Sequence, residues 1–276
     1  MKIKSLLAVA AVGLAGILAA PVASAQGFLL PGTASAQTCY FPWLCPPPPP
    51  PTVTWTQFAS DDFNRVGPDL GPNWIIRGAG VPYIQNQESS GAGTPSVPTS
   101  YGYWATPAST HVQSASATVR WEGRDPAHSL AALSVRADPS RMGTDPVNWT
   151  TQTGASGVMF WFTSGLMGLD YEHPNTGTAS NPSYFTPLNG TASYVSTSKF
   201  PEGARIELRV TEGANGVDTY TAYVNGTQVL QGTLSTSIVP RTQHYVGFET
   251  QDDGTASSAN GQPAANLDDF VASQGS

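Results

Sequence analysis

Acidic residues spaced as strand neighbours are the first candidates for chemistry in this chain. Asp170 and Glu172 are two positions apart in a strand-like segment, so their side chains would project from the same face. Glu249 begins a second acidic segment, 249–253. With His173, which follows Glu172, the first pair could form a metal or acid/base cluster. The alternative is a surface strand end with mixed charges, which is the commoner arrangement.

Nucleophilic catalysis by a Ser-His-Asp triad has little support. The chain has four histidines and no G-x-S-x-G segment, in which a strained turn would expose a nucleophilic serine.

The elements that must hold these residues are predicted to be short strands. From Thr52 onward, alternating apolar and polar residues are separated by Gly, Pro, Asn, Asp and Ser, and no segment has a capped helical period. Asn225-Gly226 predicts a two-residue type I′ hairpin turn. The expected strands are 54–58, 73–77, 100–105, 111–122, 129–137, 157–163, 166–172, 192–197, 205–211, 218–224, 227–233, 245–251 and 266–272. One face of these strands is expected to be buried and the other wet, as in antiparallel sheets. The fold class is therefore all-β, an antiparallel two-sheet sandwich.

Two segments make a family resemblance specific. The early sequence DDFNR…LGPNW (61–65 and 70–74) and the late sequence VGFE…LDDFVAS (246–249 and 267–273) resemble concanavalin A-like lectin/glucanase jelly rolls. The similarity is strongest to laminin-G-like domains of secreted actinobacterial proteins and of phage tail proteins, and it covers most of residues 54–273. The resemblance implies that the first and last strands pair. Phe63 and Phe270 are then expected in the core.

The resemblance also implies two possible uses of the domain. Glycosidases of this fold carry two glutamates and an aspartate alternating on one strand, and neither acidic segment here has that spacing, which weakens a hydrolase interpretation. The outer face of one sheet is often concave in the families that the chain resembles, and sugars bind to aromatic faces and planar polar groups. Outward side chains expected to converge on a ligand are Arg136, Trp161, Asp170, Tyr245 and Glu249, with Tyr101, Tyr103, Trp104 and Trp149 at the rim. For Trp161, burial in the core is the alternative.

Calcium binding is a further expectation from the resemblance, since related jelly rolls often bind Ca²⁺ through Asp and carbonyl oxygens. Among the acidic pairs, we predict Asp62 and Asp269 as ligands. Solvated turns are the alternative.

The N-terminus is predicted to be a signal peptide, residues 1–25. Lys2 and Lys4 precede an apolar stretch from Leu6 to Ala20, and Ala23-Ser24-Ala25 forms a cleavage site. The apolar stretch is short for a transmembrane anchor. The mature protein is therefore expected to be secreted, without an anchor.

Residues 26–51 are predicted to be a linker before the domain at 52–276. In an exported chain, Cys39 and Cys45 are expected to form a disulfide, closing a small loop that contains Tyr40, Phe41 and Trp43. Six prolines follow, Pro46 to Pro51, and predict a polyproline II rod.

Composition narrows the function classes. The 276 residues carry a net charge of −7, and no basic cluster lies past residue 4, which disfavours nucleic acid as a partner. We expect a secreted, non-catalytic module that binds a glycan or a cell-envelope component. The alternatives are a divergent glycoside hydrolase or lyase, and an adhesion protein that uses the Cys loop and Pro rod as a spacer.

Overall fold

The computed structural model describes most of one compact unit, Pro51–Ser276. The described residues are 52–65, 69–78, 81–85, 88–92, 99–121, 129–142, 154, 156–163, 165–174, 176, 184–192, 194–197, 200–252 and 266–276. The predicted signal peptide, the Cys39–Cys45 loop, the polyproline segment and Trp149 lie outside them.

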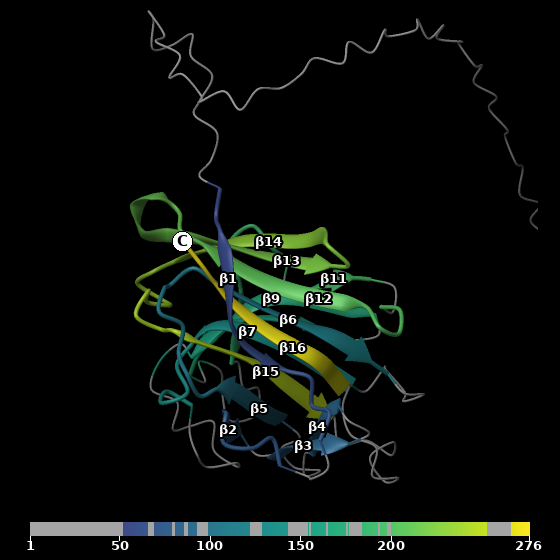
Figure 1. Cartoon of the computed structure of the whole chain (residues 1–276). Helices are drawn as coiled ribbons and strands as arrows, with labels where there is room; N and C mark the ends of the chain where they lie inside the picture. Colours follow the sequence, from purple (N-terminus) through teal and green to yellow (C-terminus); the bar gives the residue numbers. More distant parts are fainter. Residues whose placement is uncertain are drawn as a thin grey trace, which may run out of the picture. The chain divides into compact units, whose positions relative to one another are not determined.

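The unit is a sandwich of two antiparallel eight-stranded sheets (Figure 1). In spatial order, sheet A contains β14 (Thr227–Ser235), β13 (Val217–Val224), β12 (Arg205–Thr211), β6 (Gln113–Arg120), β16 (Asn266–Gly275), β4 (Glu88–Ala92) and β3 (Val81–Gln85), while β1 (Trp55–Asp61) also pairs with β16. Sheet B contains β10 (Phe185–Pro187), β9 (Leu166–Glu172), β8 (Gly157–Phe162), β7 (Ser129–Ala137), β15 (Tyr245–Asp252), β5 (Thr99–Trp104) and β2 (Trp74–Gly78), while β11 (Val195–Ser196) also pairs with β9. The predicted two-sheet, jelly-roll class is confirmed.

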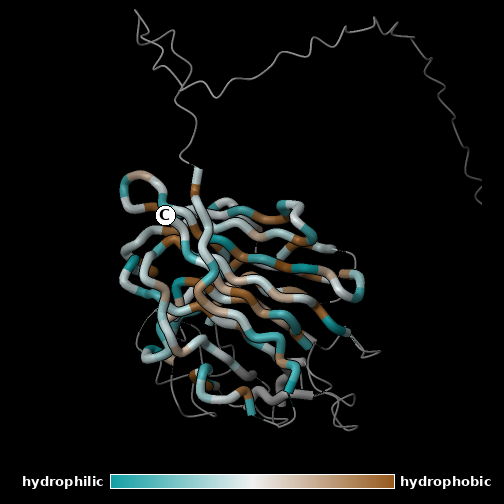
Figure 2. Tube along the Cα trace, viewed as in Figure 1, coloured by the Kyte–Doolittle hydropathy of each residue, from teal (hydrophilic) through white to brown (hydrophobic). Residues whose placement is uncertain are grey.

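The main core lies between the sheets and follows the alternation of the sequence. On β12, Ile206, Leu208 and Val210 are buried, and the residues between them are partly exposed. In Figure 2 apolar and polar residues accordingly alternate along the strands instead of forming long apolar runs. The β13–β14 hairpin turns at Asn225-Gly226, where both residues have positive φ, as a type I′ turn requires.

The first and last strands close the fold, as predicted. In Figure 1, β1 and β16 run side by side, and their register joins Trp55 to Gly275 and Asp61 to Phe270. Phe63 and Phe270 are fully buried, and both pack near the ring of Trp74.

The Asp61 carboxylate fastens the segment that follows β1. It accepts hydrogen bonds from Arg65 Nη1 at 2.6 Å, from Trp74 Nε1 at 2.7 Å and from the Phe63 amide at 2.8 Å. The DDFNR motif therefore has a structural role: its hydrogen bonds hold this segment in place.

Three strands, β3, β4 and β10, were not predicted from the sequence, and the expectation of a wet outer face is wrong for sheet B. β3 contains a proline, β4 consists mostly of Ser, Gly and Ala, and β10 has three residues, so no clear alternation marks them. The outer face of sheet B was expected to be wet, but on β7 every residue from Ala131 to Ala137 is buried.

In the described part of the chain the one helical element is a 3₁₀ turn, Ala214–Gly216, and no helix there could cross a membrane.

Candidate functional site

The outer face of sheet B carries a second hydrophobic cluster, separate from the main core. Its buried members are Tyr101, Tyr103, Ala132, Ala137, Met142 and Met159, with Ile75, Leu130, Trp161 and Tyr245 packed against them. A flat sheet face in contact with water would leave these tyrosines exposed, so this face is not an open, flat surface. We call it the sheet B hollow.

Strand register arranges the hollow in rows. Trp161 on β8 and Glu249 on β15 both stand opposite Ala132 on β7. Trp161 also stands opposite Gly168 on β9, and Glu249 opposite Tyr101 on β5. The small side chain of Ala132 therefore stands between the indole and the carboxylate in this row.

Trp161 is held in place by its two partners on β9. A Cβ atom on Gly168 would lie 2.4 Å from the indole Nε1, so only glycine lets the ring lie over this position. The indole Nε1 donates a hydrogen bond of 2.5 Å to Oδ2 of Asp170. The ring is therefore fixed before any ligand arrives.

Tyr101 shows that the sheet curls around this face. Its hydroxyl donates a 3.0 Å hydrogen bond to Oε1 of Glu172, although β5 and β9 are four strands apart in sheet B. Neighbouring strands lie about 4.8 Å apart, so two side chains could not meet across a flat sheet of this width. The outer face is therefore concave. Tyr103 stacks beside Tyr101, with ring centroids 6.1 Å apart.

Three carboxyl groups are buried in the hollow: Asp170, Glu172 and Glu249 are 5%, 2% and 1% exposed. Burial raises the pKa of Asp170 to about 6, against the opposing hydrogen bond from Trp161. Burial also raises the pKa of Glu172 to about 7, opposed by hydrogen bonds from Ser156 and Tyr101. For Glu249, burial and then the charge of Glu172 hold the pKa well above its usual value.

Two of these acids line a cavity of about 170 Å³. Its walls are Leu130, Met159, Trp161, Asp170, Phe185 and Glu249. Asp170 Oδ1 and Glu249 Oε2 are buried without a hydrogen-bond partner among the described residues. Because a buried polar atom without a partner is costly, these two oxygens are unsatisfied acceptors of the site.

The structure brings four of the five predicted ligand residues to this face. Trp161, Asp170 and Glu249 line the cavity, and Tyr245 packs against the surrounding apolar cluster. Trp161 is partly exposed and does not belong to the main core, which was the alternative considered for it. Arg136 does not join them.

Arg136 was expected outward on β7, and that expectation is wrong because of a β-bulge. Between Tyr245 and Gly247 the register with β7 shifts by one residue, and Arg136 there has a φ of 52°. The bulge ends the alternation and directs the fully buried side chain away from the hollow.

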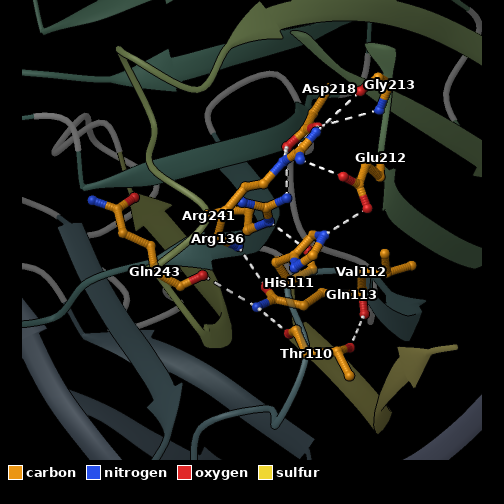
Figure 3. Close-up of polar contacts among 10 residues, drawn as sticks. All are labelled: Thr110, His111, Val112, Gln113, Arg136, Glu212, Gly213, Asp218, Arg241 and Gln243. Atoms are coloured by element: carbon orange, nitrogen blue, oxygen red, sulfur yellow. Dashed lines mark hydrogen bonds and ion pairs between the residues drawn. The ribbon is translucent and has the colours of Figure 1, made fainter. Parts of the chain in front are cut away.

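Figure 3 shows where Arg136 goes instead. Its Nη2 donates at 2.6 Å to Oδ2 of Asp218, a residue of β13 in the other sheet, and its Nε donates to the His111 carbonyl. Although burial opposes it, the hydrogen bonds from Arg241 and the charge of Arg136 hold the pKa of Asp218 below its usual value. Arg136 therefore links the two sheets.

The predicted set omitted residues that the structure adds to the site. The sequence indicates Glu172 only as half of an acidic pair, and it predicts Tyr101 and Tyr103 at the rim, whereas both lie inside the hollow. Trp104 packs against the main core. The alternation Gly168-x-Asp170-x-Glu172 was the available signal, but the sequence does not say which strands face β9.

The predicted calcium ligands lie in a different place. Asp62 and Asp269 both line an open groove of about 750 Å³ beside β1 and β16. Neighbouring Asp61 is occupied by Arg65 and Trp74. The described residues contain no group of three or more His, Cys, Asp or Glu side chains able to hold a metal ion. Calcium binding stays a prediction.

Comparisons with known proteins bear on the fold. No protein-family model and no curated protein matches the chain. Three solved structures that resemble it are a 1,3-α-1,4-β-D-galactose-4-sulfate-3,6-anhydro-D-galactose 4 galactohydrolase, the carbohydrate recognition domain of Emp46p and a legume lectin-like domain from Entamoeba histolytica. They are 13%, 10% and 10% identical to this chain, with TM-scores of 0.49, 0.48 and 0.42. The matches cover 84%, 78% and 72% of this chain and 100%, 98% and 89% of the other chains. At such identities the likeness concerns the chain trace and says nothing about the ligand.

Proposed function

We propose that the sheet B hollow binds a glycan, with Trp161, Asp170 and Glu249 as the contacting side chains. The observation that carries this proposal is the pair of unpartnered carboxyl oxygens, Asp170 Oδ1 and Glu249 Oε2, in one cavity with an indole. Sugar rings combine donor hydroxyl groups with apolar C–H faces. Carboxylate oxygens accept hydrogen bonds from the hydroxyl groups, and aromatic rings stack on the C–H faces.

The arrangement favours binding because little has to be ordered when a ligand arrives. Gly168 and the hydrogen bond to Asp170 already fix the indole of Trp161. Glu172, the neighbouring acid, is fixed because it accepts hydrogen bonds from the hydroxyl groups of Tyr101 and Ser156. A preformed site loses less entropy on binding.

Glycan-array screening followed by calorimetry tests the proposal. Trp161→Ala and Glu249→Gln should each weaken binding by about tenfold or more, the cost of removing a stacking surface or a charge-assisted hydrogen bond. The control is Glu207→Gln on the outer face of sheet A, which should bind as the unsubstituted protein does. Absence of binding to every glycan, or full binding by both site variants, would contradict the proposal.

Hydrolysis of a glycosidic bond is the second candidate function. It is favoured by the raised pKa values of Asp170, about 6, and Glu172, about 7, which suit a general acid near neutral pH. Glu249, whose Oε2 has no hydrogen-bond partner among the described residues, would then act as the second carboxylate. The test is release of reducing ends from the glycan that binds, and its loss in Glu172→Gln and Asp170→Asn. A bound glycan that remains intact removes this candidate.

We also propose that the domain acts outside the cell or at the cell envelope. The support is the sequence of residues 1–25 and the Cys-loop and proline segment that follows. N-terminal sequencing of exported protein should begin at Gln26. If the segment at 37–51 is a spacer for adhesion, its deletion should abolish surface association and leave glycan binding intact.

A further inference from the structure

We infer that the group seated between Asp170 and Glu249 is the protonated primary amine of an amino sugar, and that the hollow distinguishes free hexosamine residues from acetylated ones. This inference rests on the proposed glycan-binding function and specifies its ligand. It is carried by two buried carboxyl oxygens without partners in a cavity that is otherwise apolar.

The charge of the hollow is one-sided. On the described strand residues of this face, the one basic side chain is Arg77 on β2, which is in register with Tyr101 and stands two strands from Glu249. Its Nε and Nη1 donate to the carbonyl oxygens of Pro139 and Ile76. His173, directly after Glu172, contacts the Pro174 carbonyl and the Thr186 hydroxyl. The acids thus have no basic side chain bonded to them among the described residues.

An ammonium group fits such a cavity better than the other groups that sugars carry. It has three donors and one positive charge, so it can donate to a carboxyl oxygen and compensate for the burial of the acids' negative charge. A hydroxyl has one donor and an acetamide one N–H, and neither brings charge. The carboxylate of a uronic acid would add another buried negative charge beside these acids and should be rejected.

The walls suit the rest of an amino sugar. Leu130, Met159 and Phe185 would contact the C–H groups around the amine, and the indole of Trp161 could face the cation. The size agrees as well: 170 Å³ is below the roughly 300–1,000 Å³ of drug-sized pockets, so the cavity would take one sugar residue of a longer chain.

Binding of a cation here should release protons. Asp170 is faced by Trp161 from β8, and Glu249 by Tyr101 from β5 and Glu172 from β9. Tyr103 is the other ionisable group of the hollow, close to Arg77 and Asp138. Burial raises the pKa of Glu249 and raises that of Asp170 to about 6, so at pH 6 about half of the Asp170 carboxyl groups hold a proton. An incoming ammonium favours the ionised forms, and the displaced proton passes to the buffer.

The decisive experiment compares two tetrasaccharides with the same backbone. One consists of glucosamine residues and the other of N-acetylglucosamine residues. Isothermal titration of the full chain with each, in two buffers of different ionisation enthalpy, gives affinity and proton release together. We expect the glucosamine form to bind at least about tenfold more tightly, with proton release at pH 6–7, because charge-assisted hydrogen bonds are the stronger kind. Asp170→Asn and Glu249→Gln should remove the preference, and Glu207→Gln should retain it, in proteins whose melting temperature shows that they are folded.

The outcomes separate this inference from the proposal beneath it. Two results would contradict the inference that the ligand is an amine but leave the glycan-binding proposal intact. The first is equal or tighter binding of the acetylated tetrasaccharide, and the second is tight binding of a neutral glycan without any binding of the glucosamine tetrasaccharide. Binding of a lysine-rich peptide in place of either sugar assigns the cavity to a protein amine and overturns the sugar. Absence of binding to all glycans overturns both. The comparison of the two sugars on the unsubstituted protein needs no variant to fold.

Discussion

At the residue scale, the position of Trp161 depends on the absence of a side chain at Gly168. The indole covers the backbone of β9 there and reaches Asp170, so one glycine sets both a wall of the cavity and the partner of one carboxyl oxygen. Because Asp170 uses Oδ2 for this bond, Oδ1 is left for the cavity.

Gly168→Ala should therefore impair the site more than the fold. The new Cβ would lie 2.4 Å from Trp161 Nε1, so the ring must move and its bond to Asp170 must break. Overpacking of this kind costs about 1–3 kcal/mol of stability. Ligand affinity should fall by about tenfold or more, the loss expected when a charge-assisted hydrogen bond is removed. Tryptophan fluorescence and calorimetry measure the two effects.

A matched control lies in the turn before the same strand. Gly165 has nothing within 4 Å of an added Cβ, so Gly165→Ala should leave both fluorescence and binding unchanged. If Gly168→Ala behaved like Gly165→Ala, Trp161 would not be positioned by its neighbour.

At the element scale, β9 shows what the sequence could and could not predict about the site. The two-residue period placed Asp170 and Glu172 on one face, and its bounds were predicted correctly at Leu166–Glu172. Nothing in that segment indicates that Tyr101 reaches Glu172 from β5, because the order of strands in a sheet depends on pairing between distant segments. The predicted outward position of Arg136 is wrong for a related reason, since a bulge is a property of two paired strands.

The burial of Glu172 predicts how stability varies with pH. Its pKa is about 7 in the folded state against an ordinary 4.5, and that of Asp170 is about 6 against 3.8. Between about pH 4 and 7 the folded protein therefore holds protons that the unfolded chain has released, so the free energy of unfolding should fall as pH rises through this window. For Glu172 the change is on the order of 3 kcal/mol.

Urea unfolding at pH 4, 5.5 and 7.5 measures this dependence. Glu172→Gln, which resembles the protonated acid, should flatten the profile, while Glu207→Gln on sheet A should leave it parallel to that of the unsubstituted protein. A profile that stays equally steep in Glu172→Gln would contradict the burial of an ionisable group at this position.

At the scale of the whole molecule, the fold is closed by a strand from the end of the sequence. β16 lies within sheet A, paired with β6 on one side and with β4 and β1 on the other. The pairing of the terminal strands was predictable because the DDFNR and LDDFVAS motifs resemble those of known jelly rolls. The place of β16 beside β6 was not, since it depends on which edges remain unpaired once all other strands have formed.

Because β16 joins strands from the beginning and the middle of the chain, its removal should unfold the domain, whereas removal of the segment before β1 should not. Leu267, Phe270 and Ala272 are fully buried, and replacing a buried phenylalanine by alanine alone costs about 3–5 kcal/mol. That is comparable with the roughly 5–15 kcal/mol that stabilise a typical domain. A chain ending at Ala265 should lack a cooperative thermal transition in circular dichroism, and Phe270→Ala should melt at a lower temperature but still cooperatively. A chain beginning at Thr52 should melt as the full chain does, because residues 51–276 form one compact unit. A cooperative transition after loss of β16 would mean that sheet A can close without it.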